Sequence, residues 1–382
     1  MTEDWYFCSH RLPLARAAKA AGYEVHVVTR VREHGARIEE AGLQLHPLDM
    51  RRGDKRVWRE VLLLARLFRL YRQIRPHIAH HVAMKPVLYG SLVAGSIPGV
   101  RIVNALAGLG YLFASETAKR SLTARLVRTV LGPVLRYGER RVIVQNADDQ
   151  ALMRQFGVAP EQIHLIRGSG VDVHYFQPLP EPPVPESCGS ESFAPLTAAM
   201  VARLLWDKGI GELVEAARLL KARGVPLTVL VAGTTDPANP ASLAEQQVRA
   251  WVAQGLVQWL GHVEDVREVW RQAHIAVLPS YREGLPKALL EAAACGRPLV
   301  ATDVAGCREI AVAGVSAITV PAGDAEALAG ALVAMMADAA ARARMGGQAR
   351  QLVESEFSET RVIGDTLALY AALLDATGGG GV

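Results

Sequence analysis

The stretch REGLPKALLEAAACGRPLVATDVAGCREI, residues 282–310, decides the fold. The apolar run IAVL at 275–278 precedes it and predicts a buried strand. A loop with Gly284 then leads into an apolar helix pattern, with Pro286 near the first turn, a favoured place for proline. PLVAT at 298–302 begins a further strand. Strand, loop, helix and strand in this order predict one unit of a parallel α/β sheet.

Two glutamates of this stretch, Glu283 and Glu291, are candidate ligand-binding residues. In open α/β sheets, ligands bind outside the carboxyl ends of the strands, and a helix N-terminus there favours an anion such as a diphosphate. Gly284 lets the backbone approach that ligand closely. Glu291, roughly one and a half turns into the helix, is suited to accept hydrogen bonds from a ribose diol. Glu283 is then free to meet hydroxyls of the group that the diphosphate carries. The alternative is that both are solvated surface charges, as a lone pair of glutamates usually is.

A second motif, LTAAMVARLLWDKG at 196–209, adds two cations. Arg203 follows a predicted strand, and Lys208 opens the next helix. Near the proposed diphosphate they would stabilise the charge of a departing nucleoside diphosphate electrostatically. By itself, such a spacing is usually a surface turn.

The remaining chain continues the α/β rhythm in two halves. Helical patterns occupy 12–21 and 57–74, among others, and the predicted strands are 24–29, 78–82, 101–105, 142–145, 163–166, 197–201, 227–232, 257–260, 275–278, 299–301 and 318–320. Between the halves lies a Pro-rich connector without periodicity. The expected fold class is therefore α/β, with two doubly wound parallel-sheet domains facing across a cleft.

The predicted boundaries are an N-terminal domain at 1–176, a linker at 177–195, a C-terminal domain at 196–357, and a helix with a disordered tail at 358–382. A doubly wound domain usually opens with a buried strand, but this sequence begins MTEDWYFCSHRLPLARAAKAAG, which predicts a polar loop and then a helix. The first strand is expected to be missing.

Composition indicates an ordinary globular protein, with 50% hydrophobic and 21% charged residues. The sequence has no uncharged apolar run of about 18 residues, so no transmembrane helix is expected. No signal peptide is expected either. The four cysteines, Cys8, Cys188, Cys295 and Cys307, form no CxxC pair. They predict free thiols and a cytoplasmic location.

Charge divides between the halves. Residues 1–172 hold 26 Lys and Arg against 15 Asp and Glu, a net +11, and the remainder is −7. Basic residues recur with leucine and tryptophan at 56–75 and again at 119–141. Such patterns suit an anionic membrane surface, although a solvated face of a sheet-packing helix is an equal alternative. Nucleic-acid binding is disfavoured, because no aromatic platform or binding motif accompanies the charge.

VARLLWDKG and SYREGLPKALLEAAACGRPLVATDVAGCREI together resemble the retaining glycosyltransferases of the fourth sequence family, whose GT-B fold has two Rossmann-like domains. RGSGVDVHYF at 167–176 is similar to the segment where that family leaves its N-terminal domain. EDWYFCSHRLPLARAA, HHVAMKPVLYGSLVA and VNALAGLGYLF resemble the branch that extends polyprenyl-diphosphate-linked saccharides. The similarity covers nearly the whole chain.

The resemblance implies a role for each site residue. Arg203 and Lys208 would contact the donor diphosphate, Glu283 the donor sugar, Glu291 the ribose, and the loop around Val263 the nucleobase, with Gly284, Leu285 and Pro286 beside the donor. Arg203, Lys208 and Glu283 would carry catalysis. The acceptor-side candidates are Asp4, Ser9, His10, His81, Lys85, Asn104 and Gly108. The last four are candidates because they lie at or just after the ends of predicted strands, although a histidine in such a place is as often structural as chemical.

The implied activity is a retaining hexosyltransferase that moves a hexose or N-acetylhexosamine from a UDP-sugar to a lipid-linked saccharide in bacterial surface-glycan assembly. It would act as a peripheral protein on the inner face of the cell membrane, without a cofactor. No metal is expected, because no Asp-x-Asp follows a strand and the two cations can replace it. The alternatives are a nucleotide-sugar epimerase and a catalytically silent scaffold. The missing strand favours the scaffold, and the intact set of four charged residues argues against it.

Overall fold

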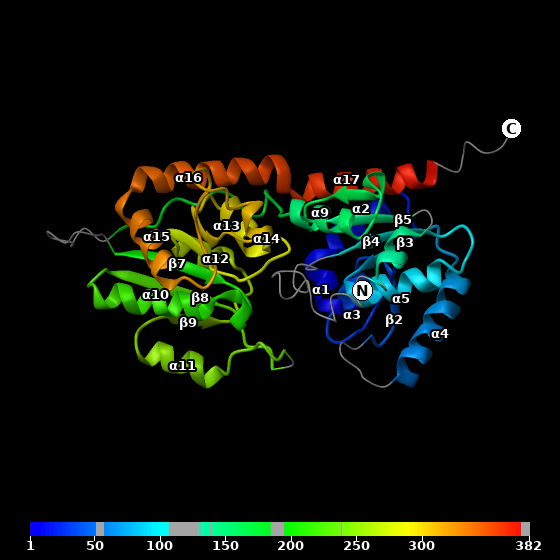
Figure 1. The fold of residues 1–382 in the computed structure, drawn as a ribbon, viewed down its shortest axis with the longest axis horizontal. Helices are drawn as coiled ribbons and strands as arrows, with labels where there is room; N and C mark the ends of the chain where they lie inside the picture. The colour runs from blue at the N-terminus through cyan, green and yellow to red at the C-terminus, as the bar shows by residue number, and fades with distance from the viewer. Residues whose placement is uncertain are drawn as a thin grey trace. The chain divides into compact units, whose positions relative to one another are not determined.

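The computed structural model describes residues 1–50, 57–106, 129, 131–137, 140–184, 195–237 and 239–375. The chain divides into two compact units, one of Met1–Ser169 with Glu359–Val382 and the other of Gly170–Ser358 (Figure 1). The C-terminal helix α17 (Glu359–Asp375) therefore belongs to the first unit, although it follows the second unit in sequence.

The second unit contains one parallel six-stranded sheet of order β12-β11-β10-β7-β8-β9. Its strands are β7 (Leu196–Val201), β8 (Leu227–Ala232), β9 (Gln258–Gly261), β10 (Ile275–Leu278), β11 (Leu299–Thr302) and β12 (Ala317–Val320). Numbered within the unit and read from β9, this is the order 3-2-1-4-5-6 of doubly wound nucleotide-binding domains. Each predicted strand of this half lies within one residue of its observed bounds.

Helices cover both faces of this sheet (Figure 1). They are α10 (Ile210–Ala222), α11 (Glu245–Ala253), α12 (Arg267–Gln272), α13 (Lys287–Ala294), α14 (Ala305–Arg308), α15 (Ala325–Ala337) and α16 (Ala339–Leu352), with a 3₁₀ turn at Trp206–Lys208 and a π-helical turn at Val353–Phe357. α10 packs against α15, and α13 against α16. Strands β10 and β11 are buried along their whole length, as expected of parallel strands covered on both faces.

The first unit contains two parallel sheets. One joins β1 (His26–Thr29) to β2 (Gln44–Pro47), and the other has the order β3 (Ile78–Val82), β4 (Arg101–Ala105), β5 (Arg140–Val144), β6 (Ile163–Leu165). Its helices besides α17 are α1 (Asp4–His10), α2 (Leu12–Ala20), α3 (Gly35–Glu40), α4 (Val57–Ile74), α5 (Met84–Ala94) and α9 (Ala147–Gln155), with a 3₁₀ turn at Pro160–Gln162. Strand β2 was not predicted, because its half-exposed sequence QLHP has no apolar run.

The polar loop predicted at the start of the chain is wrong for Asp4–His10, which form α1. The Asp4 carboxylate is fully buried and accepts hydrogen bonds from the backbone N–H groups of Arg32 (2.7 Å) and His34 (2.9 Å). Phe7 and Cys8 pack into the core beside it. Tertiary contacts therefore stabilise a helix that the polar sequence does not predict.

Helix α4 separates apolar from basic residues. Leu63, Leu67 and Tyr71 are buried in the core, whereas Arg66, Arg69 and Arg72 are exposed. Most of the second basic stretch, at 119–141, lies outside the described residues. Among the described helices, none is both long and apolar enough to cross a membrane. Cys8, Cys295 and Cys307 are free thiols, and Cys188 lies outside the described residues.

Candidate functional site

The candidate site lies where the strand order of the second unit reverses. The neighbouring strands β7 and β10 pair in parallel, Ile275 opposite Ala198, and the chain leaves them in opposite directions across the sheet. Crevices outside the carboxyl ends of such strands are the usual ligand sites of open α/β sheets. Arg203 and Lys208 follow β7, and Glu283 follows β10, so the topology brings the predicted donor residues to one edge.

Close backbone contact fixes the two loops against each other. Gly209 has a left-handed φ of 73°, and a Cβ added there would lie 1.9 Å from the carbonyl oxygen of Pro279. The Tyr281 N–H donates to the carbonyl oxygen of Asp207 at 3.0 Å. Only glycine suits Gly209 on both counts, because it tolerates the positive φ and leaves room for the neighbouring carbonyl. This contact places Lys208 beside the loop of Glu283.

A polar cluster joins Lys208, Glu283 and Ser280. The Lys208 ammonium donates to Glu283 Oε1 at 2.5 Å, and the Ser280 hydroxyl donates to the same oxygen at 2.7 Å. The Glu283 side chain is 9% exposed and that of Lys208 is 21% exposed. A half-buried ion pair of this kind holds both groups in fixed geometry at the carboxyl end of the sheet. Sequence reasoning found the two charges but not Ser280.

Arg203 has an acidic partner that the sequence analysis missed. Its Nη1 lies 3.0 Å from Asp236 Oδ2, in the loop that follows β8. The Asp236 N–H donates to the Ser242 hydroxyl at 2.8 Å, and the Leu204 N–H donates to the Thr234 carbonyl, so this loop is tied to the Arg203 segment. The available signal was the position of Asp236 just after a strand, at the same edge of the sheet as Arg203.

Glu291 lies in the first turns of α13 and is buried. Burial raises its pKa to about 7, while the Lys287 ammonium, 3.7 Å from Oε1, acts in the opposite direction. The loop that contains Glu283 and Gly284 is held against strand β11 and helix α14. A Cβ on Gly306 would lie 2.5 Å from the Gly284 carbonyl oxygen, and the Thr302 hydroxyl donates to the Ser280 carbonyl.

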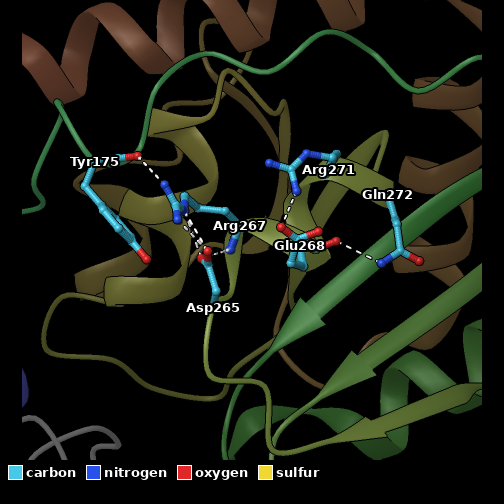
Figure 2. A network of polar contacts seen from close by, with 6 residues as sticks. All are labelled: Tyr175, Asp265, Arg267, Glu268, Arg271 and Gln272. Carbon is cyan, nitrogen blue, oxygen red and sulfur yellow. Dashed lines mark hydrogen bonds and ion pairs between the residues drawn. The ribbon is translucent and has the colours of Figure 1, made fainter.

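The loop that contains Val263 is anchored by Asp265 and Arg267 (Figure 2). The single Nε–H of Arg267 is shared between the two carboxylate oxygens of Asp265, at 2.9 and 3.0 Å, and Nη2 donates to Oδ2 at 2.5 Å. The guanidinium carbon lies 3.7 Å from the centre of the Tyr175 ring. This hydrogen bonding lowers the pKa of Asp265 to about 2. Val263 itself is half-buried against the core of the second unit. The network thus fixes the end of the loop, and the nucleobase role of Val263 stays a prediction.

The acceptor-side candidates His81, Asn104 and Lys85 make side-chain contacts within the first unit. The His81 ring is buried, with Nδ1 3.0 Å from Asn104 Oδ1 and Nε2 3.0 Å from the Tyr71 hydroxyl. Lys85 donates to Glu60 at 2.8 Å. These contacts favour a structural role for His81, because both of its ring nitrogens already bond within the core. Asn104 Oδ1 is bonded too, whereas its buried Nδ2 has no hydrogen-bond partner among the described residues.

The other acceptor-side candidates differ in exposure. Asp4 is buried in the contacts that form α1. Ser9 is exposed, with its hydroxyl 2.5 Å from His10 Nδ1, and the His10 ring stacks on Tyr6 at 4.2 Å. Gly108 lies outside the described residues. The acceptor roles of these residues stay predictions.

Comparison with known proteins identifies the family. A family model described as "Glycosyl transferase 4-like" matches residues 1–146, and one described as "Glycosyl transferases group 1" matches residues 195–338. Together they cover more than half of the chain. The chain belongs to the glycosyltransferases. The predicted family resemblance is thus confirmed.

Two curated relatives show the range of similarity. The N,N'-diacetylbacillosaminyl-diphospho-undecaprenol alpha-1,3-N-acetylgalactosaminyltransferase of Campylobacter jejuni is 27% identical over 307 residues, which are 78% of each chain. An amylovoran biosynthesis glycosyltransferase of Erwinia amylovora is 33% identical over 177 residues, 43% of this chain and 42% of the relative.

Solved structures confirm the GT-B fold of this glycosyltransferase. The sucrose-phosphate synthase of Thermosynechococcus elongatus superposes with a TM-score of 0.77 at 22% identity, covering 95% of this chain and 92% of that one. Anabaena Alr3699/HepE, solved in complex with UDP, superposes with a TM-score of 0.74 at 15% identity, covering 94% of each chain.

Proposed function

We propose that this glycosyltransferase moves a hexose or N-acetylhexosamine from a UDP-sugar to a lipid-linked saccharide during bacterial surface-glycan assembly, with retention at the anomeric carbon. The observation that carries the donor half of the proposal is the cluster of Lys208, Ser280 and Glu283 at the switch point of the sheet. The acceptor half rests on the Campylobacter relative, whose name specifies a diphospho-undecaprenol-linked acceptor. UDP is favoured because several proteins of similar fold were solved with it.

In this proposal each charged residue binds one part of the donor. Lys208 and Arg203 bind the diphosphate, and Glu291 accepts hydrogen bonds from the ribose diol. Diphosphate binding draws Lys208 away from Glu283, whose carboxylate then accepts hydrogen bonds from the sugar hydroxyls. The positive charge needed by the leaving group comes from Arg203 and Lys208. We therefore expect turnover to persist in EDTA, and loss of activity that Mg²⁺ restores would contradict this part of the proposal.

The proposed reaction is a front-face displacement. The acceptor hydroxyl oxygen forms a bond to the anomeric carbon on the face from which the diphosphate leaves, so the configuration is retained. The bond between the anomeric carbon and the diphosphate oxygen breaks, and that oxygen takes the hydroxyl proton. Lys208 and Arg203 stabilise the negative charge that collects on the diphosphate during this step.

The test is donor hydrolysis and transfer with purified protein across UDP-, GDP- and ADP-sugars, following released nucleoside diphosphate. We expect turnover of one UDP-sugar and faster turnover when a polyprenyl-diphosphate saccharide is added. Glu283→Gln should retain UDP affinity and lose about 100-fold or more in transfer, the usual size for a lost transition-state contact. Glu326→Gln, an exposed change on α15, is the matched control. Unchanged turnover in Glu283→Gln would refute the sugar role.

We also propose that helix α4 contacts an anionic membrane. Its exposed Trp58, Val61 and Leu62 are 58%, 60% and 48% accessible, and exposed arginines continue along the helix. Amphipathic basic helices with an aromatic residue lie in the membrane interface. We expect binding to vesicles that contain phosphatidylglycerol and weaker binding by the Trp58→Ser, Leu62→Ser double variant. Equal binding by both proteins would overturn this assignment.

A further inference from the structure

Two histidines on neighbouring strands of the first unit bond to each other. His26 begins β1 and His46 lies in β2, and the two strands pair in parallel with His26 opposite Gln44. His26 Nδ1 lies 2.9 Å from His46 Nε2, and the two rings stack with their centres 5.2 Å apart. Imidazole is the commonest metal ligand of proteins. Two imidazole nitrogens this close together are therefore candidate ligands of a single ion.

The pair occupies one face of this two-stranded sheet. Successive side chains of a strand point to opposite faces, so Val27 and Leu45, which adjoin the two histidines in sequence, lie on the other face. There they pack in the core with Phe7. The His26 side chain is 19% exposed, and His46 is half-buried. The core thus fixes the strands that carry the pair, and an ion can still reach it from solvent.

A carboxylate holds the outer nitrogen of His26. Glu24 Oε1 lies 3.4 Å from His26 Nε2, and Gln44 Nε2 donates to the same oxygen at 2.5 Å. An ionised carboxylate can only accept, so we assign the proton of neutral His26 to Nε2. Nδ1 then carries the lone pair on the side of His46. A carboxylate that fixes the outer nitrogen of a ligand histidine in this way recurs at metal sites.

The separation of the two inner nitrogens fits one metal ion. Bonds from a metal to imidazole are about 2.0–2.1 Å long, so two of them at a right angle place the nitrogens about 2.9 Å apart, and at a tetrahedral angle about 3.3 Å apart. The observed 2.9 Å matches the right-angled coordination of Cu²⁺ and Ni²⁺ better than the tetrahedral coordination of Zn²⁺. The same distance is an ordinary hydrogen bond. Replacement of the shared proton by an ion therefore requires no movement of the strands.

The protonation of His46 also suits an ion. A histidine nitrogen must be unprotonated to bind a metal. Burial lowers the pKa of His46, and the neighbouring His26 lowers it further, so the ring of His46 is neutral at pH 7. Its single proton lies on Nε2 while that nitrogen donates to His26. When an ion takes this place, the proton leaves Nε2 for solvent and another is taken up at Nδ1, so the ring stays neutral.

The remaining ligands of the ion would be water. Among the described residues, no group of three or more His, Cys, Asp or Glu side chains is placed to hold a metal ion. Glu24 bonds to the outer nitrogen of His26 and so acts on the ion only through that ring. Because β2 pairs with no strand except β1 in the described part of the chain, an ion held by both histidines would cross-link β2 to its single neighbour.

We propose that His26 Nδ1 and His46 Nε2 bind one divalent transition-metal ion, with Cu²⁺ and Ni²⁺ preferred over Zn²⁺, and that the bound ion cross-links β1 and β2. Glu24 is a positioning residue of this site. The site contains none of the residues assigned above to sugar transfer. Its ion therefore stabilises the first unit and takes no part in the proposed reaction, for which turnover in EDTA is expected.

The test is calorimetric titration at pH 7 of the full chain, purified without a histidine tag and freed of metal with EDTA that is then removed. Ni²⁺ and Zn²⁺ are titrated in parallel, and we expect one Ni²⁺ per chain, bound more tightly than Zn²⁺. His26→Gln and His46→Gln should each weaken Ni²⁺ binding by about 100-fold or more, because one histidine cannot chelate. Glu24→Gln should weaken it about tenfold, as loss of the partner of a ligand histidine does. The control His174→Gln, at an exposed histidine of the second unit, should leave binding unchanged.

Thermal unfolding supplies a second readout and shows whether each metal-free variant is folded. Ni²⁺ at about 100-fold above its dissociation constant should raise the unfolding midpoint of the first unit by about 5 °C or more. The same Ni²⁺ concentration should leave the midpoint of His46→Gln unchanged, because that variant lacks one of the two ligands.

Absence of one-to-one Ni²⁺ binding by the wild type would overturn the proposal, and so would equal affinity in His26→Gln or His46→Gln, which would place the ion elsewhere. Tighter binding of Zn²⁺ than of Ni²⁺ would overturn the right-angled geometry. Unchanged affinity in Glu24→Gln, a change at an exposed side chain, would overturn the positioning role of that carboxylate. None of these readouts uses catalytic activity, so the result does not depend on the proposed transfer reaction.

Discussion

Glu291 allows a direct test of how much a buried carboxylate in the candidate site lowers the free energy of unfolding. Its pKa in the folded protein is about 7, against an ordinary value of 4.5, because the carboxylate is buried. That difference corresponds to about 3 kcal/mol, at roughly 1.4 kcal/mol per pKa unit. The side chain is 11% exposed, and local solvation reduces the penalty, so we expect about 2 kcal/mol.

The sign follows from the protons bound in each state. Below pH 4.5 both the folded and the unfolded protein hold the Glu291 proton, and the residue costs nothing. Between pH 4.5 and about 7 the unfolded chain releases this proton while the folded protein retains it, so stability falls as the pH rises. Above pH 7 the full penalty applies. Glu291→Gln stays neutral and lacks this pH dependence.

Urea unfolding of the wild type and Glu291→Gln at pH 5, 6, 7 and 8 measures the effect. Tryptophan fluorescence reports chiefly on the second unit, which holds four of the six tryptophans, Trp206, Trp251, Trp259 and Trp270. The stability advantage of the variant should be small at pH 5, rise steeply to pH 7 and level off at about 2 kcal/mol by pH 8. Glu245→Gln, an exposed change on α11, should show no such trend. Parallel pH profiles for wild type and Glu291→Gln would refute the reasoning.

Three further predictions concern packing and helix capping in the second unit. Gly209→Ala should lower the free energy of unfolding in urea by more than about 2 kcal/mol. The new Cβ would lie 1.9 Å from the Pro279 carbonyl oxygen, and alanine at a positive φ is also strained. The control Gly224→Ala has a similar positive φ but no atom within 4 Å of the new Cβ, so it should lose only about 1 kcal/mol of unfolding free energy. Equal losses in the two variants would contradict the role of the Gly209–Pro279 contact. On α16, Gly346→Ala should destabilise, since the new Cβ meets the Gly296 carbonyl at 2.1 Å. At the neighbouring Gly347 an added Cβ meets no atom within 4 Å, so Gly347→Ala should raise the unfolding midpoint, because alanine favours a helix more than glycine does. A lower midpoint in Gly347→Ala would contradict the packing argument. Asp324→Ala removes the side chain that caps α15 at the Ala327 N–H and should cost about 1 kcal/mol, measured as a lower midpoint of thermal unfolding; an unchanged midpoint would show that the cap is not needed.

The sequence predicted best where one local pattern determines the structure. Strands β10 and β11 are buried along their whole length, and burial on both faces leaves little choice of register or type. Strand β2 and helix α1 escaped prediction because distant residues stabilise them. The carboxylate of Asp4, for example, accepts N–H groups from residues 32 and 34, contacts that no local window contains.

The same distinction applies to the candidate site. Lys208 and Glu283 were found because each stands in a recognisable strand-end motif. Asp236 was missed because its link to Arg203 joins positions 33 residues apart through the pairing of β7 with β8. His81 and Asn104 were predicted as cleft residues from their places at strand ends, but their side chains bond to each other in the core. A strand-end position indicates which edge a residue occupies, and not where its side chain points.

The pairing of charges within the site bears on how the proposed donor would be recognised. Each cation has a carboxylate partner in the second unit: Lys208 with Glu283, Arg203 with Asp236, and Lys287 with Glu291. A diphosphate that takes Lys208 leaves the little-exposed Glu283 without its cation, which costs free energy unless other donors replace it. Sugar hydroxyls are such donors, whereas free UDP offers none at that position. If the proposed donor binds as described, the ion pair would penalise UDP relative to UDP-sugar, and this difference would favour exchange of the spent nucleotide for a new donor.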